Sequence, residues 1–254
     1  MEISYAGQRV LVTGAARGIG QEIARAFAGE GAAVDAADIA AVAMPDMPDM
    51  PAKPGAPGSV TAHRLDVTDG AAIAQLVDAA GPFDIAIHAA GGIRGQRAKP
   101  IEAVTDADWQ AIQAVNTDAA FFVARAVAPG MKARGRGRII VISSGAGMRV
   151  SRTGIHAYGT AKTAQIGLVR QLSAELGPFG ITVNAIAPGY MPQTSPDYLP
   201  QWEALGAEGQ AAVVEGIAMR RLGTPRDIAN AALFLASPFA EWITGQVLPV
   251  MGGP

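Results

Sequence analysis

The segment Val10-Leu11-Val12-Thr13-Gly14-Ala15-Ala16-Arg17-Gly18-Ile19-Gly20 decides the fold of this chain. A short apolar run typical of a buried strand meets three glycines spaced Gly-x3-Gly-x-Gly, and an amphipathic helical pattern follows over residues 19–27. Glycines at such a turn let the backbone approach a pyrophosphate, and the helix N-terminus attracts the anion. The pattern predicts a dinucleotide site at Gly14, Arg17, Gly18, Ile19 and Gly20, although a glycine-rich turn alone is often only a turn.

Other apolar runs alternate with helical patterns along the rest of the chain. The strand-like runs cover residues 33–37, 85–89, 139–142 and 183–187. Parallel strands joined by helices produce this alternation. The chain of 254 residues is therefore predicted to form one α/β domain over residues 1–254, a Rossmann-like, doubly wound parallel sheet with helices on both faces.

Two segments stand outside this alternation. Residues 43–59 contain five prolines, which lack the amide donors of a strand or helix interior, so we expect an extended surface loop there. Residues 190–216 mix proline, glycine and aromatic residues after the last buried strand, where this topology places its ligand crevice. This second segment is the predicted substrate lid.

Composition excludes several classes of function. Lysine and arginine number 20 against 22 acidic residues, and no long basic run is present, which argues against nucleic acid as a partner. With no cysteine and three scattered histidines, disulfides, thiol nucleophiles and a metal site are not expected. No signal-like start and no membrane-length apolar run are found, so we expect a cytoplasmic protein that acts on a small molecule.

Asp38 indicates which dinucleotide the turn accepts. It lies eighteen positions after Gly20, near the end of the second predicted strand, where a carboxylate can accept hydrogen bonds from the adenosine ribose hydroxyls. This favours NAD, because a carboxylate repels the additional phosphate of NADP, although Arg17 could offset part of that repulsion. In the alternative interpretation Asp38 is a solvated acid and Arg17 a surface charge.

Tyr158 and Lys162 are four residues apart and would share one face of a helix. A tyrosine that acts as a general base near neutral pH needs its pKa lowered by about three units from about 10, roughly 4 kcal/mol. A nearby ammonium and a positive nicotinamide ring can provide this. Alone, the pair says little, because tyrosine is common in cores and lysine on surfaces.

Together, residues 13–20, Asn116, Ser143-Ser144, Tyr158-x3-Lys162 and Pro188-Gly189 resemble the classical short-chain dehydrogenase/reductase family. Residues 221–223, 228–229, 234–237 and 243–245 also follow that family's pattern, so the resemblance covers essentially the whole chain. It implies an NAD-dependent oxidoreductase that moves a hydride between nicotinamide and a secondary alcohol or ketone carbon.

The resemblance also implies a role for each motif residue. Tyr158 would exchange the substrate hydroxyl proton, and Lys162 would lower the pKa of Tyr158 and hold the nicotinamide ribose. Ser144 would hydrogen-bond the reacting oxygen, and Asn116 would hold a water that relays protons from Lys162. Read locally, Asn116 is a helix-interior amide and Ser144 a turn residue. Further cofactor contacts are implied at Asp66, Val67, Ala90, Gly91, Pro188, Gly189 and Met191.

The chain departs from the family pattern in four places, one of which is Met251 in the tail, where aspartate is frequent. His88 replaces the first asparagine of the usual Asn-Asn-Ala-Gly, and we expect it to be a packed strand residue. Ser144 precedes the tyrosine by fourteen positions where thirteen is usual, so either the loop between them has one more residue or Ser143 partly substitutes. Gln193 stands where threonine is common, with Thr194 one position later.

Five basic residues flank the predicted pocket: Arg94, Arg97, Lys99, Arg149 and Arg152. They favour an acidic substrate, with Arg152 as the expected carboxylate contact, Arg149 as its substitute and His156 as a further candidate contact, although loop arginines are usually solvated. Residues 91–102 and 244–250 are similar to cyclic diol carboxylate dehydrogenases of the family.

Several alternatives stay open on the sequence alone. Other family members reduce 3-oxoacyl thioesters or act on sugars and simple alcohols, including with NADP. A non-catalytic regulator that senses NAD would keep the fold and lose part of the catalytic set, which is complete here. The helical patterns over 106–133 and 157–176 are apolar on more than one face, so we expect burial against other subunits, as in a homotetramer.

Overall fold

The computed structural model describes residues 3–43 and 58–253 of the chain. The predicted proline-rich loop over residues 43–59 lies almost entirely outside these residues. The predicted end of this loop, residue 59, is one residue too far along the chain, because a strand begins at Ser59.

One parallel sheet carries the described fold, with seven strands in the order β3-β2-β1-β4-β5-β6-β7. The strand order reverses beside β1, which places β1 and β4 next to each other at the centre. Loops leaving neighbouring strands diverge at such a reversal and leave a crevice at the carboxyl ends of the strands. The strands are β1 (Arg9–Thr13), β2 (Ala33–Asp38), β3 (Ser59–Arg64), β4 (Ile85–His88), β5 (Gly137–Ile142), β6 (Ile181–Pro188) and β7 (Val247–Val250).

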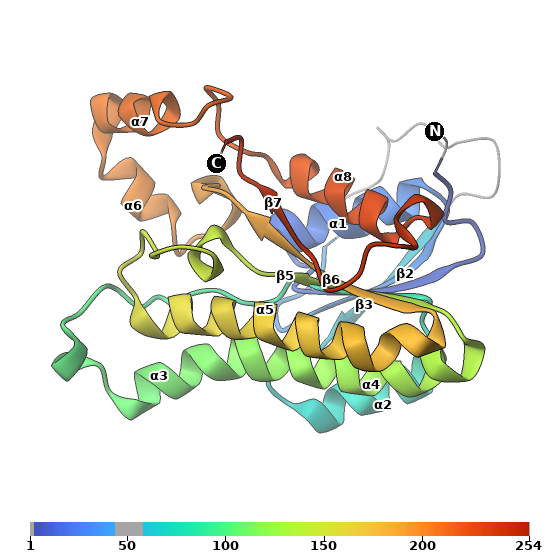
Figure 1. Cartoon of the computed structure of the whole chain (residues 1–254). Helices are drawn as coiled ribbons and strands as arrows, with labels where there is room; N and C mark the ends of the chain where they lie inside the picture. The colour runs from blue at the N-terminus through green and yellow to red at the C-terminus, as the bar shows by residue number, and fades with distance from the viewer. Residues whose placement is uncertain (1–2, 44–57, 254) are drawn as a thin grey trace.

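Helices cover both faces of the sheet, as Figure 1 shows. On one face lie α1 (Gly18–Gly29) and α8 (Pro225–Ala236), and on the other lie α2 (Gly70–Ala80), α4 (Ala119–Arg134) and α5 (His156–Leu176). Side chains alternate between the two faces along a strand, so Val10 and Val12 join the core under α1 and α8, whereas Leu11 joins the core under α4 and α5. The predicted doubly wound α/β fold is confirmed.

Two strands escaped the sequence-based prediction, and both are edge strands. β3 is largely exposed along its length, so it lacks the continuous apolar run of a central strand. β7 contains Pro249, which is tolerated because the strand pairs on one side only, with β6. The four apolar runs predicted from the sequence match β2, β4, β5 and β6 to within two residues at each end.

The helical pattern predicted over 106–133 is interrupted in the structure. α3 (Asp106–Gln113) leads into a π-helical turn, Ala114–Asp118, and α4 continues from Ala119. Such turns occur often at functional sites, because the widened backbone redirects a side chain. Asn116 lies inside this one and is fully buried.

Residues 190–216 form a separate lobe at one end of the molecule in Figure 1, where the predicted lid was placed. It contains α6 (Leu199–Glu203) and α7 (Gly206–Glu215). The C-terminal tail returns to the segment that follows this lobe, where the Met219 amide donates to the Gly252 carbonyl at 2.9 Å. Short turns of 3-10 helix cover Ile101–Ala103, Gly145–Gly147, Gly177–Phe179, Pro192–Thr194 and Pro238–Ala240.

No helix among the described residues has both the length and the apolarity needed to cross a membrane.

Candidate active site

A cleft of about 1230 Å³ opens where the strand ends meet the lid. Its walls come from the loops after β1, β2, β3, β4, β5 and β6, together with the lobe over residues 190–216. Every predicted cofactor residue except Gly18 lines it: Gly14, Arg17, Ile19, Gly20, Asp38, Asp66, Val67, Ala90, Gly91, Tyr158, Lys162, Pro188, Gly189 and Met191. Folding therefore brings segments that are far apart in the sequence to one wall.

The glycine-rich turn has the conformation that a phosphate cradle needs. Gly14 has a φ of +73°, and a Cβ there would lie 2.5 Å from the Ala90 nitrogen, so only glycine fits. At the start of α1, Arg17 makes no side-chain cap, which leaves first-turn amides to an anion. Contrary to the prediction, Gly18 does not line the cleft. A Cβ on Gly18 would lie 2.4 Å from the Thr194 carbonyl oxygen, which covers this residue.

Two carboxylates stand at the end of the cleft nearest β2 and β3. Asp38 accepts hydrogen bonds from the amides of Ala16 at 3.0 Å and Ala40 at 2.9 Å, which fix its side chain against the glycine-rich turn. Asp66 accepts from the amide and hydroxyl of Thr68 at 2.9 and 2.8 Å. Because a carboxylate has about four acceptor positions, each can still accept a hydroxyl or amine of a bound nucleotide.

Tyr158 lies at the first turn of α5, with its hydroxyl near two others. Hydrogen bonding from the side chains of Tyr198 and Ser144 lowers its pKa, but burial acts more strongly and holds that pKa above the ordinary value. Ser144 follows the end of β5 by two residues and is fixed by the Ala146 amide, which donates to Oγ at 3.1 Å. Ser143 points elsewhere and donates to the Lys162 carbonyl at 2.9 Å, so Ser144 is the serine that faces the tyrosine.

Lys162 presents its ammonium in the floor of the cleft. Its Nζ donates to the Ile142 carbonyl at 3.0 Å and to Gln165 Oε1 at 3.1 Å, and lies 5.7 Å from the centre of the Tyr158 ring. Burial lowers the pKa of Lys162 to about 7. An ammonium has three donors, so one N–H is left for a ligand.

Asn116 lies beneath the cleft, where its side chain hydrogen-bonds to backbone groups and does not line the cavity. Its Nδ2 donates to the carbonyls of Gly92 and Ile112, both at 2.9 Å, and its Oδ1 accepts from the Gly92 amide at 3.1 Å. The side chain thus fastens the π-helical turn to the loop after β4. The local interpretation of Asn116 describes these contacts, and Oδ1, which accepts one hydrogen bond here, retains a second acceptor position, so the relay water stays a prediction.

His88 is buried in β4, as predicted. Its Nδ1 lies 3.0 Å from the Thr13 hydroxyl, while Nε2 has no hydrogen-bond partner among the described residues. Burial, assisted by the Lys162 charge, lowers its pKa to about 3, so the imidazole is neutral at physiological pH.

Arginines gather at the end of the cleft next to the lid: Arg94, Arg149, Arg152 and Arg220. Arg94 and Arg220 have φ of 54° and 51°, the left-handed region that non-glycine residues rarely adopt. No other non-glycine residue in the described chain does so. The charge of Arg152 acts on the phenol of Tyr190 in the lid, and no carboxylate pairs with Arg152 within the described residues.

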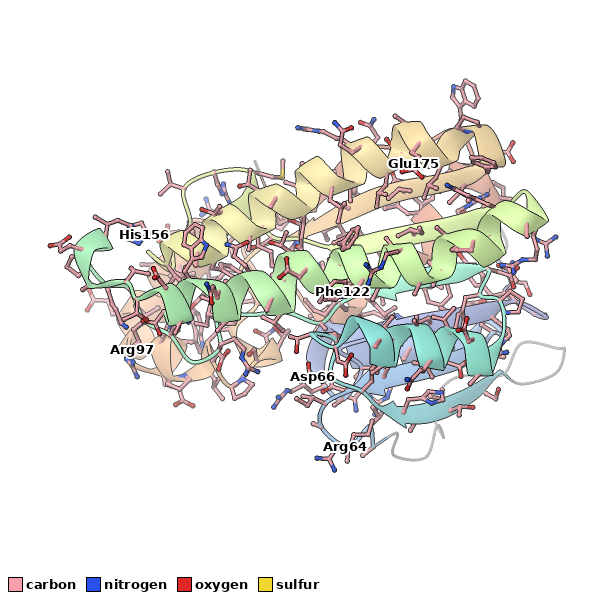
Figure 2. The ribbon with its side chains drawn as sticks, turned by 90° about the horizontal axis from the view of Figure 1, so that it is seen from below. Arg64, Asp66, Arg97, Phe122, His156 and Glu175 are labelled. Carbon is pink, nitrogen blue, oxygen red and sulfur yellow. The ribbon has the colours of Figure 1, made fainter. Side chains whose placement is uncertain are left out.

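Three predicted substrate-side residues lie elsewhere. His156, Arg97 and Lys99 border a shallow depression beside α3 rather than the cleft, and Lys99 pairs with Asp108 at 2.7 Å. Figure 2 shows His156 and Arg97 at the same end of the molecule, away from Asp66. His156 precedes Tyr158 by two residues, about 200° around a helix, so its side chain points away from the catalytic face. We therefore remove it from the substrate contacts.

Among the cleft or site residues that were not predicted are Asp197, Tyr198 and Arg220 in the lid region, and Gln165 on α5. The lid residues carry no motif, and only the fold brings them to Tyr158. Gln165 had a usable signal, because it follows Lys162 by three residues and must share its helix face.

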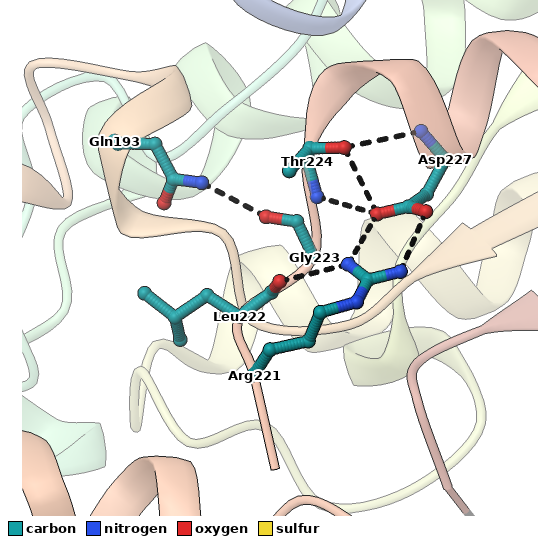
Figure 3. Close-up of polar contacts among 6 residues, drawn as sticks. All are labelled: Gln193, Arg221, Leu222, Gly223, Thr224 and Asp227. Atoms are coloured by element: carbon teal, nitrogen blue, oxygen red, sulfur yellow. Dashed lines mark hydrogen bonds and ion pairs between the residues drawn. The ribbon is translucent and has the colours of Figure 1, made fainter. Parts of the chain in front are cut away.

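The lid is anchored at its base to the start of α8, as Figure 3 shows. Gln193 donates to the Gly223 carbonyl at 2.8 Å. Arg221 donates two hydrogen bonds, of 2.8 and 2.9 Å, to the Asp227 carboxylate. Thr224 and Asp227 form a capping box at the start of α8. With Gln193 directed to this anchor, Thr194 is the residue that meets the glycine-rich turn.

Within residues 3–43 and 58–253, no group of three or more His, Cys, Asp or Glu side chains is placed to hold a metal ion.

Comparison with known proteins identifies the family. The family model described as Enoyl-(Acyl carrier protein) reductase matches residues 14–254. The chain is 38% identical over 253 residues to 2-keto-3-deoxy-L-fuconate dehydrogenase of Xanthomonas campestris pv. campestris, covering 97% of this chain and 80% of that protein. It is 37% identical to 7alpha-hydroxysteroid dehydrogenase of Escherichia coli K12, covering 97% and 94% of the two chains.

Solved structures agree and carry nicotinamide cofactors in the same fold. A 7α-hydroxysteroid dehydrogenase complexed with NADH and 7-oxo glycochenodeoxycholic acid superposes with a TM-score of 0.82 at 33% identity, covering 98% of this chain and 95% of that one. An Agrobacterium tumefaciens protein with bound NADP, provisionally described as 2-deoxy-D-gluconate 3-dehydrogenase, gives 0.82 at 36% identity, covering 98% and 96%. This chain therefore belongs to the classical short-chain dehydrogenase/reductase family and is an oxidoreductase of CH–OH groups.

Proposed function

We propose that this enzyme transfers a hydride between NAD and the carbinol carbon of a small hydroxylated acid, with Tyr158, Ser144 and Lys162 as its catalytic residues. The observation that carries the proposal is the joint position of these side chains: three catalytic groups in the cleft floor, Asp38 at the nucleotide end and arginines at the lid end.

The residues of the cleft fit a dinucleotide. The uncapped start of α1 and the close approach of Gly14 to Ala90 suit a pyrophosphate, and Asp38 suits the ribose hydroxyls. Pro188, Gly189 and Met191 line the part of the cleft that adjoins Tyr158, where the nicotinamide would lie. When bound, the cofactor supplies the hydride acceptor and a positively charged ring.

The proton chemistry follows from the three hydroxyls and the ammonium. In oxidation, Tyr158 accepts the substrate hydroxyl proton while the carbinol C–H bond breaks with transfer of a hydride, and it returns the proton in the reverse direction. Ser144 hydrogen-bonds the reacting oxygen. Because burial raises the pKa of Tyr158, the tyrosine needs positive charge close by to act near neutral pH, and Lys162 provides part of it.

The acidic substrate is supported by the arginines of the lid end. Arg152 has no carboxylate partner in the described structure, and guanidinium matches a carboxylate with two parallel hydrogen bonds. Strained backbone at Arg94 and Arg220 is retained only where the surrounding structure requires it, and such residues concentrate at ligand sites. One relative is named for a carboxylate, 2-keto-3-deoxy-L-fuconate.

Assembly and location stay predictions. A homotetramer is supported by large apolar side chains exposed on the single chain, among them Phe121 on α4 and Trp242 after α8, which are 42% and 96% exposed. The cytoplasmic location rests on the sequence alone.

The proposed chemistry predicts that Tyr158→Phe retains the packing of the ring but loses the exchangeable proton. We expect kcat to fall by at least ~100-fold, with little change in the Kd for NAD. The assay follows NADH absorbance with two pairs of compounds: gluconate and sorbitol, and dihydroxycyclohexanecarboxylate and cyclohexanediol. A variant that turned over at a near-normal rate would remove Tyr158 from the mechanism.

Cofactor choice is predicted from Asp38. The unmodified enzyme should prefer NAD over NADP in kcat/KM by at least about tenfold, or about 1.4 kcal/mol, and Asp38→Asn should shrink this preference. Asparagine keeps an acceptor for the Ala16 amide while it removes the charge. Asp66→Asn is the control, since it removes a carboxylate of the same cleft and should leave the ratio unchanged. Equal use of both cofactors by the unmodified enzyme would refute the assignment.

Substrate charge is predicted from Arg152. Arg152→Ala should lower kcat/KM for the two acids, gluconate and dihydroxycyclohexanecarboxylate, by the ~1.5 to 3 kcal/mol of a charge-assisted hydrogen bond. It should barely affect kcat/KM for their neutral counterparts, sorbitol and cyclohexanediol. Arg97→Ala makes the same change of charge outside the cleft and should affect neither. A preference for uncharged alcohols, or an equal loss on both members of a pair, would contradict an acidic substrate.

A further inference from the structure

Gln165 is a polar side chain that the proposed chemistry does not use, yet it is completely buried at the active site. It lies on α5, and both ends of its amide are engaged. Oε1 accepts from Lys162 Nζ at 3.1 Å, and Nε2 donates to the backbone carbonyl of Asn116 at 2.8 Å. Burial of an amide is unfavourable unless its groups are hydrogen-bonded, so this site is built around those two partners.

The Gln165 amide completes the surroundings of the lysine ammonium. Lys162 Nζ is also held by the Ile142 carbonyl at 3.0 Å, and a Cβ on Gly91 would lie 3.3 Å from it. Nζ therefore has two acceptors, the Ile142 carbonyl at the end of β5 and Gln165 Oε1 on its own helix. The backbone of Gly91, in the loop after β4, lies close to it. With two N–H groups held away from the cavity, the third is left for the cleft.

We propose that Gln165 is a positioning residue: its amide ties the Lys162 ammonium to the Asn116 carbonyl and fixes the lysine's free N–H toward the cleft. The inference rests on the proposed function, because it assigns Gln165 its role through Lys162. The amide lies between Lys162 and Asn116, where the family resemblance implied a water that relays protons.

Only an amide suits both partners at once. A glutamine presents an oxygen to a cation and an N–H to a carbonyl, whereas a leucine offers neither group. A carboxylate would place a negative charge beside the ammonium and cancel part of the field that Tyr158 needs. Because an amide neither gains nor loses a proton in the physiological range, this link orients charge without conducting protons.

The titratable groups that face Lys162 set the direction of a pH effect. Tyr158 lies on the same helix, with Tyr198 of the lid against it, and β4 contributes His88, which is neutral above its pKa of about 3. β5 contributes the Ile142 carbonyl, and the π-helical turn contributes the Asn116 carbonyl. Loss of the Gln165 oxygen disfavours the charged lysine, so Tyr158 loses positive charge nearby and ionises at higher pH.

The experiment measures kcat and kcat/KM for oxidation against pH, with whichever panel compound, charged or neutral, has the highest kcat/KM. Gln165→Leu should lower kcat near pH 7 about tenfold and move the rising limb of the profile to higher pH. Val169→Ala is the matched control. Val169 is buried one turn further along α5, so its truncation lowers the melting temperature without touching Lys162 and should leave the profile in place. If Gln165→Leu fails to fold, Gln165→Met replaces it, since an unbranched chain fills the same space.

A Gln165 variant with the profile and kcat of the unmodified enzyme would overturn the inference. So would a Val169→Ala variant that shifts the limb equally, since the effect would then belong to helix packing. Tyr158→Phe is measured alongside. If that variant keeps its activity, the proposed catalytic function fails, whereas an inactive Tyr158→Phe beside a normal Gln165→Leu rejects the role of Gln165 alone.

Discussion

The buried ammonium of Lys162 is held by dipoles rather than by a carboxylate. The Ile142 carbonyl and the Gln165 amide oxygen accept its protons, and desolvation lowers its pKa to about 7. A carboxylate partner would stabilise the lysine more, but the paired charges would cancel at the distance of Tyr158. This arrangement is less stable than an ion pair, but it keeps a positive field beside the Tyr158 phenol, whose burial disfavours ionisation.

The rest of the fold places ligands on either side of this charge. The reversal of strand order beside β1 opens the cleft, and the uncapped start of α1 with Asp38 forms its nucleotide end. At the other end the lid contributes Tyr198 near Tyr158, and the loop before α5 contributes Arg152. The lid is anchored next to the start of α8 by the hydrogen bond from Gln193 to the Gly223 carbonyl. The proposed acidic substrate would lie beside the positive charges at this end.

The sequence predicted those parts of the molecule that depend on periodicity and spacing. Central strands were found because both their faces are buried, whereas the edge strands β3 and β7 were missed because one side is solvated or carries proline. The Tyr-x3-Lys spacing was informative because four residues complete about one turn, and the same geometry explains why His156 faces away. Tyr198 could not be predicted, since only the lid's tertiary position brings it to Tyr158. Gln165 could have been, from its three-residue spacing to Lys162.

The most direct test of the account is the ionisation of Tyr158, followed by the ultraviolet absorbance of tyrosinate as pH is raised. The chain has four tyrosines, so one early titration is readily separated from the rest. Burial keeps the pKa of Tyr158 above its ordinary value of about 10 in the protein alone. In the presence of saturating NAD, we expect one tyrosinate that forms well below that pH and disappears in both Tyr158→Phe and Lys162→Met. If every tyrosine still titrates above about pH 10 with NAD bound, or the early tyrosinate survives in Lys162→Met, the lysine does not set the proton affinity of Tyr158 and the account is contradicted.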